Sequence, residues 1–479
     1  MRMSDTKSFV DLVVVGGGPG GYTAAFLAAD RGMSVVLIDD APRPGGVCLY
    51  RGCMPSKALL HAAKVLADAR EASMWGLSFD GLSIDVDRLR GWKNEVVRKL
   101  TSGLSHLSEQ RKISFSQGHA EFLDAQTVQV TSREASKENE TIRFKNAIVA
   151  TGSRPAMPRS FQLDDPRVLD STAALELEKI PASLLVVGGG YIGLELGTVY
   201  AALGTKVTVV ELSKSLLPGA DADLVRVLAR RIDQMVDGVC LETSVTELIP
   251  QSGGLDAVLE GSGGDIRTQR FDQVLVAVGR VPNSFVPGLE HTLVERDSRD
   301  FIVVDPHRRT AEPSIFAIGD VVGEPMLAHK AFAEARVAVD VLCGGSAEFD
   351  SQTIPAVVFT DPEVAWCGLT EGEAITEGRK ISVAKFPWGA SGRALTLNRP
   401  EGLTKLIIEP ESERILGVGV VGVGAGELIS EAVVAVEMGI SVSDLKRLIH
   451  PHPTLSETLM EAADVFFGES SHVYRPKRP

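Results

Sequence analysis

The sequence predicts an α/β protein with two Rossmann-like dinucleotide-binding domains and an α+β domain at its C-terminal end. Two observations support this prediction: a glycine-rich strand, turn and helix pattern occurs twice, and the chain that follows about Ile354 contains no such turn. The length of 479 residues is too great for one ordinary core and suggests about three domains.

The composition narrows the class of protein. Hydrophobic residues make up 44% of the chain and charged residues 23%, which is the balance of a globular protein rather than a disordered one. The formal net charge of −14 argues against general binding to nucleic acids or anionic membranes. It carries no information about an individual small ligand.

The N-terminus and the most apolar segment bear on localisation. The first strand-like segment begins within about ten residues of the N-terminus, which leaves no room for a signal peptide or a transit peptide. Residues 415–426 are too few and too rich in glycine for a membrane span, and we interpret them as a buried strand and turn. We therefore expect a cytoplasmic protein, in which a close pair of cysteines favours redox chemistry or metal binding.

An internal repeat gives the strongest information about function. Residues 12–39 align without gaps with residues 184–211, and each copy has an apolar strand, a glycine-rich turn, a helix of small residues and a second strand. This is the pattern of the dinucleotide-binding βαβ unit. In the first copy Gly16 permits the tight turn, Gly18 the approach of a pyrophosphate, and Gly21 the packing of helix on strand. The helix N-terminus presents the positive end of its dipole to the pyrophosphate.

An acidic residue ends each copy, Asp39 in the first and Glu211 in the second. Such an acid accepts hydrogen bonds from the adenosine ribose. A carboxylate at position 211 repels a 2′-phosphate and no arginine follows closely, so the second site is expected to prefer NAD to NADP. Since chemistry rarely needs two NAD molecules on one chain, we expect FAD in the first site. The glycines of the second turn are Gly188, Gly190 and Gly193.

Three further strand-like segments, at residues 147–155, 274–283 and 314–321, end in turns that contain glycine. The third places Asp320 at the C-terminal end of a strand. Ligands bind at that end of the strands in open α/β sheets, so Asp320 is a candidate binding residue.

Two of the five cysteines, Cys48 and Cys53, lie close together in the segment GGVCLYRGCMPSK, shortly after the first repeat. Pro55 suits the first turn of a helix, and strong helix formers follow it. Cys53 is then expected near a helix N-terminus with Arg51 and Lys57 nearby, and these surroundings stabilise a thiolate. Zinc binding is disfavoured because no second pair of Cys or His ligands lies close in sequence. Two unrelated buried cysteines remain the alternative.

Together with the two repeats, the segments GGVCLYRGCMPSKALLH (residues 45–61) and HPHPTLSE (residues 450–457) resemble the flavin-dependent pyridine-nucleotide disulfide oxidoreductases. The resemblance covers essentially the whole chain, and Ser56 and Lys57 resemble the dihydrolipoamide dehydrogenase branch of the family. It implies an FAD-dependent enzyme that oxidises protein-bound dihydrolipoyl groups to the disulfide and reduces NAD. A lipoyl domain or free dihydrolipoamide is the implied substrate, and a 2-oxoacid dehydrogenase complex core is the implied partner.

The resemblance also implies roles for individual residues. Cys48 is the implied interchange thiol, and Cys53 is the implied thiolate in charge-transfer contact with the flavin. Lys57 is implied to lie beside the flavin ring and to pair with Glu195 of the second Rossmann helix. The implied FAD contacts are Gly16, Gly18, Gly21, Asp39, Lys57, Ala120, Asp320 and Ala328. The implied NAD contacts are Gly188, Gly190, Gly193, Glu211, Val245, Gly279 and Arg280.

The segment HPHPTLSETL contains the implied catalytic base. His452 takes a proton from the substrate thiol, and Glu457 holds and polarises its imidazole. In the family this segment reaches across a homodimer interface to the disulfide of the other subunit. Glu457 could instead complete a capping box that begins at Thr454, and the two roles are compatible. A His-x-His metal site that includes His450 lacks further ligands, so no metal is expected.

The implied domains follow from the same comparison. They are an FAD-binding domain at residues 1–155, an NAD-binding domain at 156–281, a segment at 282–352 that completes the FAD domain, and a C-terminal interface and dimerisation domain at 353–479.

Alternative functions remain open at this point. Within the enzyme class they are a reductase that uses NAD(P)H to reduce another disulfide or mercuric ion, and a transhydrogenase. The chain lacks a C-terminal cysteine pair and retains both redox cysteines, which argues against mercuric reductases and transhydrogenases respectively. From a different class, the chain could act as a docking flavoprotein of a multienzyme core, which the retention of the candidate catalytic residues disfavours.

Several residues have no assigned chemistry. Cys240, Cys343 and Cys367 are interpreted as buried core thiols. The departures from the family pattern are Tyr50, Arg51 and Pro451, and the basic end of the chain, residues 474–479, is interpreted as a solvated tail.

Overall fold

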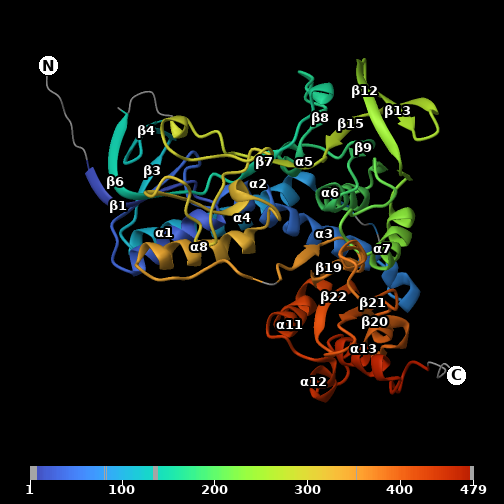
Figure 1. Ribbon diagram of the computed structural model, residues 1–479. Helices are drawn as coiled ribbons and strands as arrows, with labels where there is room; N and C mark the ends of the chain where they lie inside the picture. The colour runs from blue at the N-terminus through green and yellow to red at the C-terminus, as the bar shows by residue number, and fades with distance from the viewer. Residues whose placement is uncertain (1–7, 80, 82, 133–138, 352, 475–479) are drawn as a thin grey trace, which may run out of the picture. The chain divides into compact units, whose positions relative to one another are not determined.

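The computed structural model describes residues 8–79, 81, 83–132, 139–351 and 353–474, and Figure 1 shows its helices and strands. The chain divides into two compact units, which are described separately. The first unit draws on residues 1–58, 85–156 and 279–350, and the second on residues 59–84, 157–278 and 351–479. Of the expected solvated tail, residues 475–479 lie outside the described residues. The four domain segments expected from the sequence stay a prediction.

The first unit is built on a seven-stranded sheet. Its strands are β1 (Ser8–Val15), β2 (Val35–Asp39), β3 (Ser114–Gln117), β4 (His119–Asp124), β5 (Thr127–Thr131), β6 (Glu140–Val149) and β17 (Ile315–Ala317). Strands β3, β2, β1, β6 and β17 pair in parallel, whereas β4, β5 and β6 pair antiparallel. Leu12 and Val14 of β1 contribute to the apolar cluster on one face of the sheet, and Val13 and Val15 to the cluster on the other. Both faces are therefore buried, which accounts for the unbroken apolar run.

Two helices cover one face of this sheet. Helices α1 (Pro19–Asp30) and α8 (Ala328–Leu342) pack against each other and against β1 (Figure 1). Small residues such as Ala24 and Ala28 are fully buried and let α1 approach the sheet closely. The other elements of the first unit are α2 (Gly46–Arg51), α4 (Val86–Gln110), the short helices η3 (Leu289–His291) and η4 (Gly319–Val322), and the antiparallel pair β7 (Ser153–Pro155) and β16 (Arg280–Pro282). Helix α3 (Cys53–Glu71) begins in the first unit and ends in the second.

The second unit contains a second parallel sheet in the order β11, β10, β9, β15, β8. These strands are β8 (Val168–Leu169), β9 (Ser183–Val187), β10 (Lys206–Val210), β11 (Gly238–Cys240) and β15 (Gln273–Val276). An antiparallel sheet of β12 (Thr243–Gln251), β13 (Gly254–Gly261) and β14 (Ile266–Phe271) packs beside it. The helices of this part are α5 (Ser171–Glu176), α6 (Tyr191–Ala202) and α7 (Ala222–Met235), with the short helices η1 (Ala72–Trp75) and η2 (Arg159–Phe161).

The C-terminal part of the second unit is a five-stranded antiparallel sheet with helices. In spatial order the strands are β18 (Ala356–Val358), β19 (Glu363–Gly368), β22 (Ile415–Gly422), β21 (Leu403–Ile408) and β20 (Ser382–Pro387). The helices are α9 (Glu371–Thr376), η5 (Trp388–Ala390), α10 (Gly392–Thr396), α11 (Ala425–Glu437), α12 (Val442–Arg447) and α13 (Glu457–Phe467). One apolar cluster joins this sheet to α11, α12 and α13. Two sheets that each contain parallel βαβ units, followed by this α+β part, confirm the predicted fold class.

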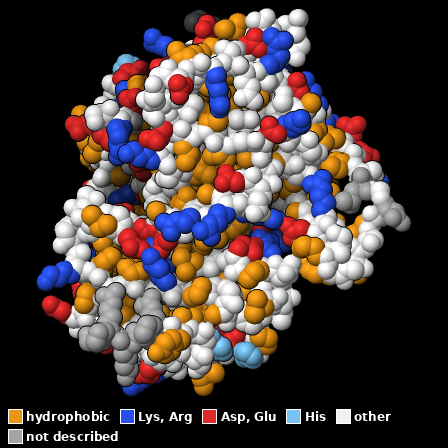
Figure 2. All heavy atoms as spheres, turned by 90° about the vertical axis from the view of Figure 1, so that its right-hand side faces the viewer, with side chains coloured by type: hydrophobic (Ala, Val, Ile, Leu, Met, Phe, Trp, Pro, Cys, Tyr) orange, Lys and Arg blue, Asp and Glu red, His pale blue; other side chains and the backbone are white. Residues whose placement is uncertain are grey.

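The most apolar segment is buried in the fold, and charged side chains lie on the surface. Residues 415–424 form the buried strand β22 and the turn after it, as predicted, and residues 425 and 426 begin α11. Among the described residues, no helix combines the length and the apolar character that crossing a membrane requires. Acidic and basic side chains are interspersed over the face that Figure 2 shows.

Candidate active site

Close contacts explain two glycines in the turn between β1 and α1. Gly16 has φ +106°, and a Cβ there would lie 2.3 Å from the carbonyl oxygen of Ala150. A Cβ on Gly21 would lie 1.8 Å from the carbonyl oxygen of Gly16, so α1 approaches this loop only because the side chain is absent. At Gly18 the nearest described atom would be 3.9 Å away, which leaves space for a pyrophosphate at the N-terminus of α1.

The turn between β9 and α6 repeats this geometry. Gly188 has φ +109°, and its Cβ would lie 2.4 Å from the carbonyl oxygen of Ala277. A Cβ on Gly193 would lie 2.1 Å from the carbonyl oxygen of Gly188, and one on Gly190 would meet no described atom within 4 Å. Each copy therefore has two glycines fixed by packing and a third that faces open space.

The acids that end the two copies also occupy equivalent places. Asp39 accepts hydrogen bonds from the N–H groups of Gly17 (2.6 Å) and Ala41 (2.8 Å). Glu211 accepts from Gly189 (2.6 Å) and Ser213 (2.7 Å). Both carboxylates thus brace their own glycine-rich loop. Burial raises the pKa of Asp39, and its two N–H partners oppose this change.

All the residues expected to contact FAD lie in the first unit. Ala120 is in β4, Ala328 is the first residue of α8, and Asp320 lies in η4 just beyond the end of β17. Asp320 accepts a hydrogen bond of 2.5 Å from the hydroxyl of Ser153. The cradle around Gly18 and the acid at the end of β2 fit a dinucleotide such as FAD.

The residues expected to contact NAD are divided between the two units. Gly188, Gly190, Gly193, Glu211 and Val245 lie in the second unit, where the loop and its acid fit a second dinucleotide. Gly279 and Arg280 lie in the first unit. The guanidinium of Arg280 donates to the hydroxyl of Ser153 (2.8 Å) and to its carbonyl oxygen (2.7 Å).

The cysteine segment is attached to the first glycine-rich turn. The N–H of Gly45 donates to the carbonyl oxygen of Gly17 at 2.7 Å, and α2 and α3 follow. Cys48 lies in α2 and Cys53 is the first residue of α3; both are half-buried, and neither forms a disulfide in this structure. The sequence predicted a helix that opens at Pro55, and it did not predict α2. Gly52, with φ −146° and ψ −114°, separates the two helices.

The two thiols influence each other and a nearby tyrosine. A hydrogen bond with Cys53 and burial raise the pKa of Cys48, whereas the charge of Lys57 opposes this change. The hydrogen bond with Cys53 and burial therefore favour the protonated form of Cys48 in the dithiol. Burial, with smaller contributions from the charges of Cys48 and Cys53, raises the pKa of Tyr22 to about 12. The sequence reasoning missed Tyr22, although it directly follows the last glycine of the turn.

The expected pair of Lys57 and Glu195 spans the two units, so it stays a prediction. Glu195 lies in α6 with only 3% of its surface exposed. Its carboxylate accepts a hydrogen bond of 3.0 Å from the N–H of Phe359, which joins α6 to the loop after β18.

His452 and Glu457 form a pair in the loop before α13. Nδ1 of His452 lies 2.9 Å from Oε1 of Glu457, and 75% of the histidine side chain is exposed. Oε2 of Glu457 accepts the N–H of Thr454 at 2.7 Å. Burial acts to raise the pKa of Glu457, but the Thr454 N–H and the imidazole outweigh it and hold this pKa below its ordinary value. One carboxylate thus orients the imidazole and fixes the loop.

The expected capping box is only half formed. Glu457 bonds to the N–H of Thr454, but the Thr454 hydroxyl donates to the carbonyl oxygen of Pro451 at 2.8 Å, and α13 begins at Glu457 itself. The residue that precedes α13, Ser456, makes no side-chain cap. The position of Glu457 at the first residue of α13 places its negative charge at the positive end of the helix dipole.

Comparison with known proteins decides the family. The family model for pyridine nucleotide-disulphide oxidoreductases matches residues 10–335, and the model for the dimerisation domain of these enzymes matches residues 354–463. The chain belongs to the pyridine nucleotide-disulphide oxidoreductases.

Curated relatives and solved structures place it more narrowly within this family. The chain is 45% identical over 457 residues to the dihydrolipoyl dehydrogenase of Vibrio cholerae, with 95% of each chain covered. It is 41% identical over 473 residues to the dihydrolipoyl dehydrogenase of Geobacillus stearothermophilus, with 99% of each covered. LpdA from Mycobacterium tuberculosis has a TM-score of 0.87 at 26% identity, covering 95% of this chain and 99% of that one. The flavoprotein disulfide reductase RclA from Escherichia coli has a TM-score of 0.85 at 28% identity, with the same coverage of both chains.

These similarities confirm the predicted family, the class of enzyme and the cofactors FAD and NAD that the family uses. The full-length similarity to dihydrolipoyl dehydrogenases confirms the activity expected from the sequence, and the match to the dimerisation domain supports a homodimer. The roles of individual residues stay predictions.

Two departures from the family pattern lie between Cys48 and Cys53. The hydroxyl of Tyr50 donates to the carbonyl oxygen of Arg43 at 3.2 Å, and its ring lies against the backbone at Gly45. Arg51 is exposed, and its charge lowers the pKa of Asp39 slightly against the effect of burial. Tyr50 therefore supports the loop that carries Cys48.

The expectation for the other cysteines is wrong for Cys343. This residue is exposed because α8 ends at Leu342 and the next residue turns toward solvent. Cys240 is half-buried, with the guanidinium of Arg267 at 2.7 Å from its sulfur. Cys367 is buried in β19 as expected, and burial raises its pKa to about 12.

Two charged groups in the second unit have partners that the sequence did not reveal. His450 pairs with Glu431 at 2.8 Å. The carboxylates of Asp221, Asp223 and Glu371 surround the fully buried ammonium of Lys405 at 2.6, 2.7 and 2.9 Å. The ammonium neutralises much of their charge, so these acids serve packing between α7, α9 and β21.

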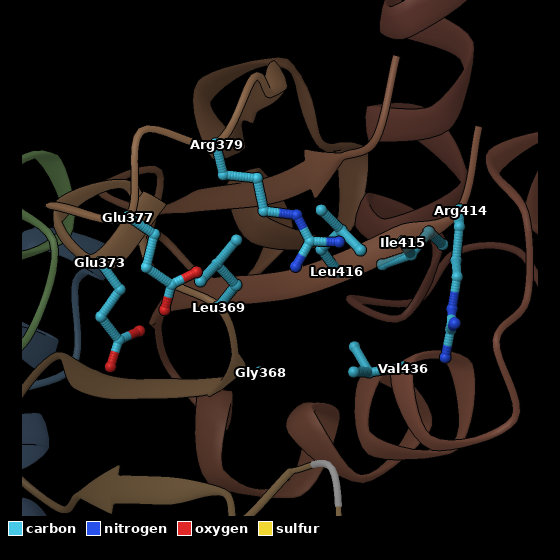
Figure 3. A pocket seen from close by; sticks show the side chains of 9 residues that line it. All are labelled: Gly368, Leu369, Glu373, Glu377, Arg379, Arg414, Ile415, Leu416 and Val436. Atoms are coloured by element: carbon cyan, nitrogen blue, oxygen red, sulfur yellow. The ribbon is translucent and has the colours of Figure 1, made fainter. Parts of the chain in front are cut away.

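A cavity of about 430 Å³ lies in the C-terminal part of the chain (Figure 3). Figure 3 shows Glu373 and Glu377 on one side of it and Arg414 on the opposite side. None of the expected catalytic or cofactor residues is among its lining residues: Gly368, Leu369, Glu373, Glu377, Arg379, Arg414, Ile415, Leu416 and Val436. The cavity is therefore separate from the candidate active site.

Proposed function

We propose that this enzyme oxidises dihydrolipoyl groups to the disulfide with reduction of NAD, through Cys48 and Cys53. The hydrogen bond from Gly45 to Gly17 carries most of this proposal, because it ties the cysteine segment to the nucleotide loop of the first unit. The full-length similarity to dihydrolipoyl dehydrogenases supports the choice of substrate.

The proposed reductive step transfers two electrons from the substrate to the enzyme disulfide. One dihydrolipoyl thiolate attacks Sγ of Cys48, the bond between Cys48 and Cys53 breaks, and Cys53 leaves as a thiolate. The second dihydrolipoyl thiolate then attacks the lipoyl sulfur that is bound to Cys48. This attack closes the lipoyl disulfide and releases Cys48. The raised pKa of Cys48 favours protonation of this thiol and leaves the charge on Cys53.

The proposed base for this step is His452. Its Nδ1 faces the Glu457 carboxylate, and its Nε2, which makes no hydrogen bond to the residues that the structure describes, can accept a proton from the substrate thiol. The negative charge of Glu457 stabilises the imidazolium that forms. In the proposed homodimer, His452 and Glu457 of one subunit serve the cysteine pair of the other, so each active site needs both subunits.

The cofactors are assigned to the two glycine-rich loops. When bound, FAD supplies a two-electron acceptor between the cysteine pair and NAD. The proposed FAD contacts are Gly16, Gly18, Gly21, Asp39, Lys57, Ala120, Asp320 and Ala328. The proposed NAD contacts are Gly188, Gly190, Gly193, Glu211, Val245 and Gly279. Lys57 and Glu195 are proposed to pair beside the flavin ring.

The proposed substrate is a lipoyl domain or free dihydrolipoamide, and the proposed partner is the core of a 2-oxoacid dehydrogenase complex in the cytoplasm.

NADH formation from free dihydrolipoamide tests the function. An FAD-loaded dimer is expected to turn over with NAD and far less efficiently with NADP. A dimer that contains stoichiometric FAD and yet forms no NADH would contradict the proposal.

A reductase that works in the opposite direction is the second candidate, favoured by the similarity to the E. coli flavoprotein disulfide reductase. NADH-dependent reduction of other disulfides, assayed beside lipoamide, separates the two. Faster turnover with another disulfide or with mercuric ion would favour this candidate.

A further inference from the structure

The Asp320 carboxylate is held by two residues in series: Ser153 bonds the carboxylate, and Arg280 bonds Ser153. Its Oδ2 accepts the Ser153 hydroxyl at 2.5 Å, and Oδ1 accepts no hydrogen bond from the described residues. Ser153 has one hydroxyl proton and gives it to Asp320, so its oxygen is an acceptor for Nε of Arg280 at 2.8 Å. Ser153 is 2% exposed, which removes water as a competing partner.

Arg280 is directed at Ser153 by two hydrogen bonds. Besides the bond from Nε, its Nη2 donates to the Ser153 carbonyl oxygen at 2.7 Å. A guanidinium held in this way presents its positive charge to the Ser153 hydroxyl that bonds Asp320, and charge-assisted hydrogen bonds are the stronger class. The sequence resemblance assigned Arg280 to NAD, but its donors face the residue that holds Asp320.

The backbone that carries these donors is rigid. Strands β7 and β16 pair antiparallel, with Ser153 opposite Pro282 and Pro155 opposite Arg280. The hydroxyl of Thr151 donates to the carbonyl oxygen of Asn283 at 2.7 Å, and the Asn283 side chain donates back to the Thr151 carbonyl at 3.0 Å. Ser153 and Arg280 therefore keep one position relative to each other.

The turn that carries Asp320 is fixed independently from its other side. The fully buried carboxylate of Glu334 accepts the Gly319 N–H at 2.6 Å. The ammonium of Lys330 donates to the carbonyl oxygens of Gly319 (3.3 Å) and Gly323 (3.1 Å), at both ends of the turn. With the backbone and Oδ2 both held in place, Oδ1 is the Asp320 oxygen that accepts no hydrogen bond from the described residues and is available to a ligand.

We propose that Arg280 and Ser153 are positioning residues of the flavin site, which aim the Asp320 carboxylate at FAD, and that Arg280 is not an NAD contact. This inference rests on the proposed assignment of Asp320 to FAD. Loss of either residue frees the carboxylate to rotate, and FAD then has to order it upon binding.

A double-mutant cycle on FAD affinity tests the proposal. The protein is freed of FAD and titrated with it, with Ser153→Ala, Arg280→Met and the double variant beside the wild type. Each single change is expected to weaken FAD binding by about tenfold, the effect of losing one charge-assisted bond. Because both act through one chain, Arg280→Met is expected to cost much less in the Ser153→Ala background. Arg280→Lys, which keeps the charge, is expected to recover part of the affinity.

Arg154→Met is the matched control. Arg154 lies on the same strand and donates to the carbonyl oxygen of Pro282 and to Asn283, but not to Ser153 or Asp320. It is expected to leave FAD affinity within about threefold of wild type, and thermal unfolding with excess FAD checks that all variants are folded.

Two outcomes would overturn the inference. One is additive losses of FAD affinity in the double variant. The other is a rise in KM for NAD with Arg280→Met while FAD affinity is unchanged, which would return Arg280 to the NAD site. Since FAD titration requires no dihydrolipoamide, a wild type that binds FAD but fails to oxidise dihydrolipoamide would refute the proposed function and leave this test intact.

Discussion

The two glycine-rich loops share one backbone geometry, but the segments of the chain that follow them differ. In each loop a carboxylate accepts the N–H of one glycine, Gly17 in the first and Gly189 in the second. The carbonyl oxygen of the same glycine accepts an N–H from later in the chain, that of Gly45 at 2.7 Å and that of Leu217 at 3.0 Å. After this contact the first copy continues into the cysteine helices α2 and α3. The second copy continues into α7, which carries no cysteine. The proposed nucleotide sites thus share one loop geometry, and the proposed redox residues lie in the segment that follows the first loop alone.

Removing the interchange thiol is the largest expected effect, because the second copy has no substitute. Cys48→Ser should lower dihydrolipoamide oxidation by at least about a thousandfold, since the disulfide can no longer form. FAD should remain bound, as the absorbance of the purified protein will report. Cys240→Ser, a change at the end of β11 beside the second loop, is the control and should keep its activity. Substantial turnover by Cys48→Ser would refute the role of this thiol.

Replacing a glycine of each loop by alanine should show which loop binds FAD and which binds NAD. A Cβ at position 21 or 193 would lie within 1.8 or 2.1 Å of a backbone oxygen. Gly21→Ala should therefore yield protein that has lost FAD. Gly193→Ala should keep FAD and raise KM for NAD by more than about tenfold. Gly103→Ala, where a Cβ would meet no described atom within 4 Å, is the control. Loss of FAD from Gly193→Ala would mean that the sites are assigned the wrong way round.

Reversing the charge of the second acid should change nucleotide preference. Glu211→Arg removes the acceptor of the Gly189 and Ser213 N–H groups and presents a cation where a 2′-phosphate would lie. The ratio of kcat/KM for NADP to that for NAD should rise by about tenfold or more. An unchanged ratio would count against contact between Glu211 and the ribose.

The smallest expected effect concerns stability and pH. The folded pKa of Glu457 lies below its ordinary value, so its ionised form stabilises the fold above the ordinary pKa and this contribution is lost as pH falls through the folded pKa. Glu457→Gln should lower the free energy of unfolding by less than about 1 kcal/mol at neutral pH, because solvent screens the pair. Urea unfolding at neutral and strongly acidic pH should show the difference only at neutral pH. A difference that grows toward acidic pH would contradict the sign of this shift.

Local patterns in the sequence were enough to predict the nucleotide loops and the cysteine segment. The glycines of each loop and its acid lie within 28 consecutive residues, residues 12–39 and 184–211, so their spacing is enough to predict the turn. His452 and Glu457, five residues apart, were predicted as a pair because the segment HPHPTLSETL resembles the family, and the structure places their side chains 2.9 Å apart.

Contacts between distant residues could not be predicted in this way. Ser153 and Asp320 are separated by 167 positions, and Lys405 and Asp223 by 182, so only the folded chain brings them together. Arg280 illustrates the limit: its motif indicated a role near a nucleotide, whereas its hydrogen bonds are to Ser153. The short helix α2 was missed because its six residues make less than two turns, too few to show a hydrophobic period.

Anaerobic reaction of the FAD-loaded protein with dihydrolipoamide, without NAD, tests most directly whether electrons enter through the first copy. Two new thiols per subunit should appear, at Cys48 and Cys53, together with long-wavelength absorbance from the Cys53 thiolate beside the flavin. Loss of flavin absorbance without new thiols at these two positions would contradict the account.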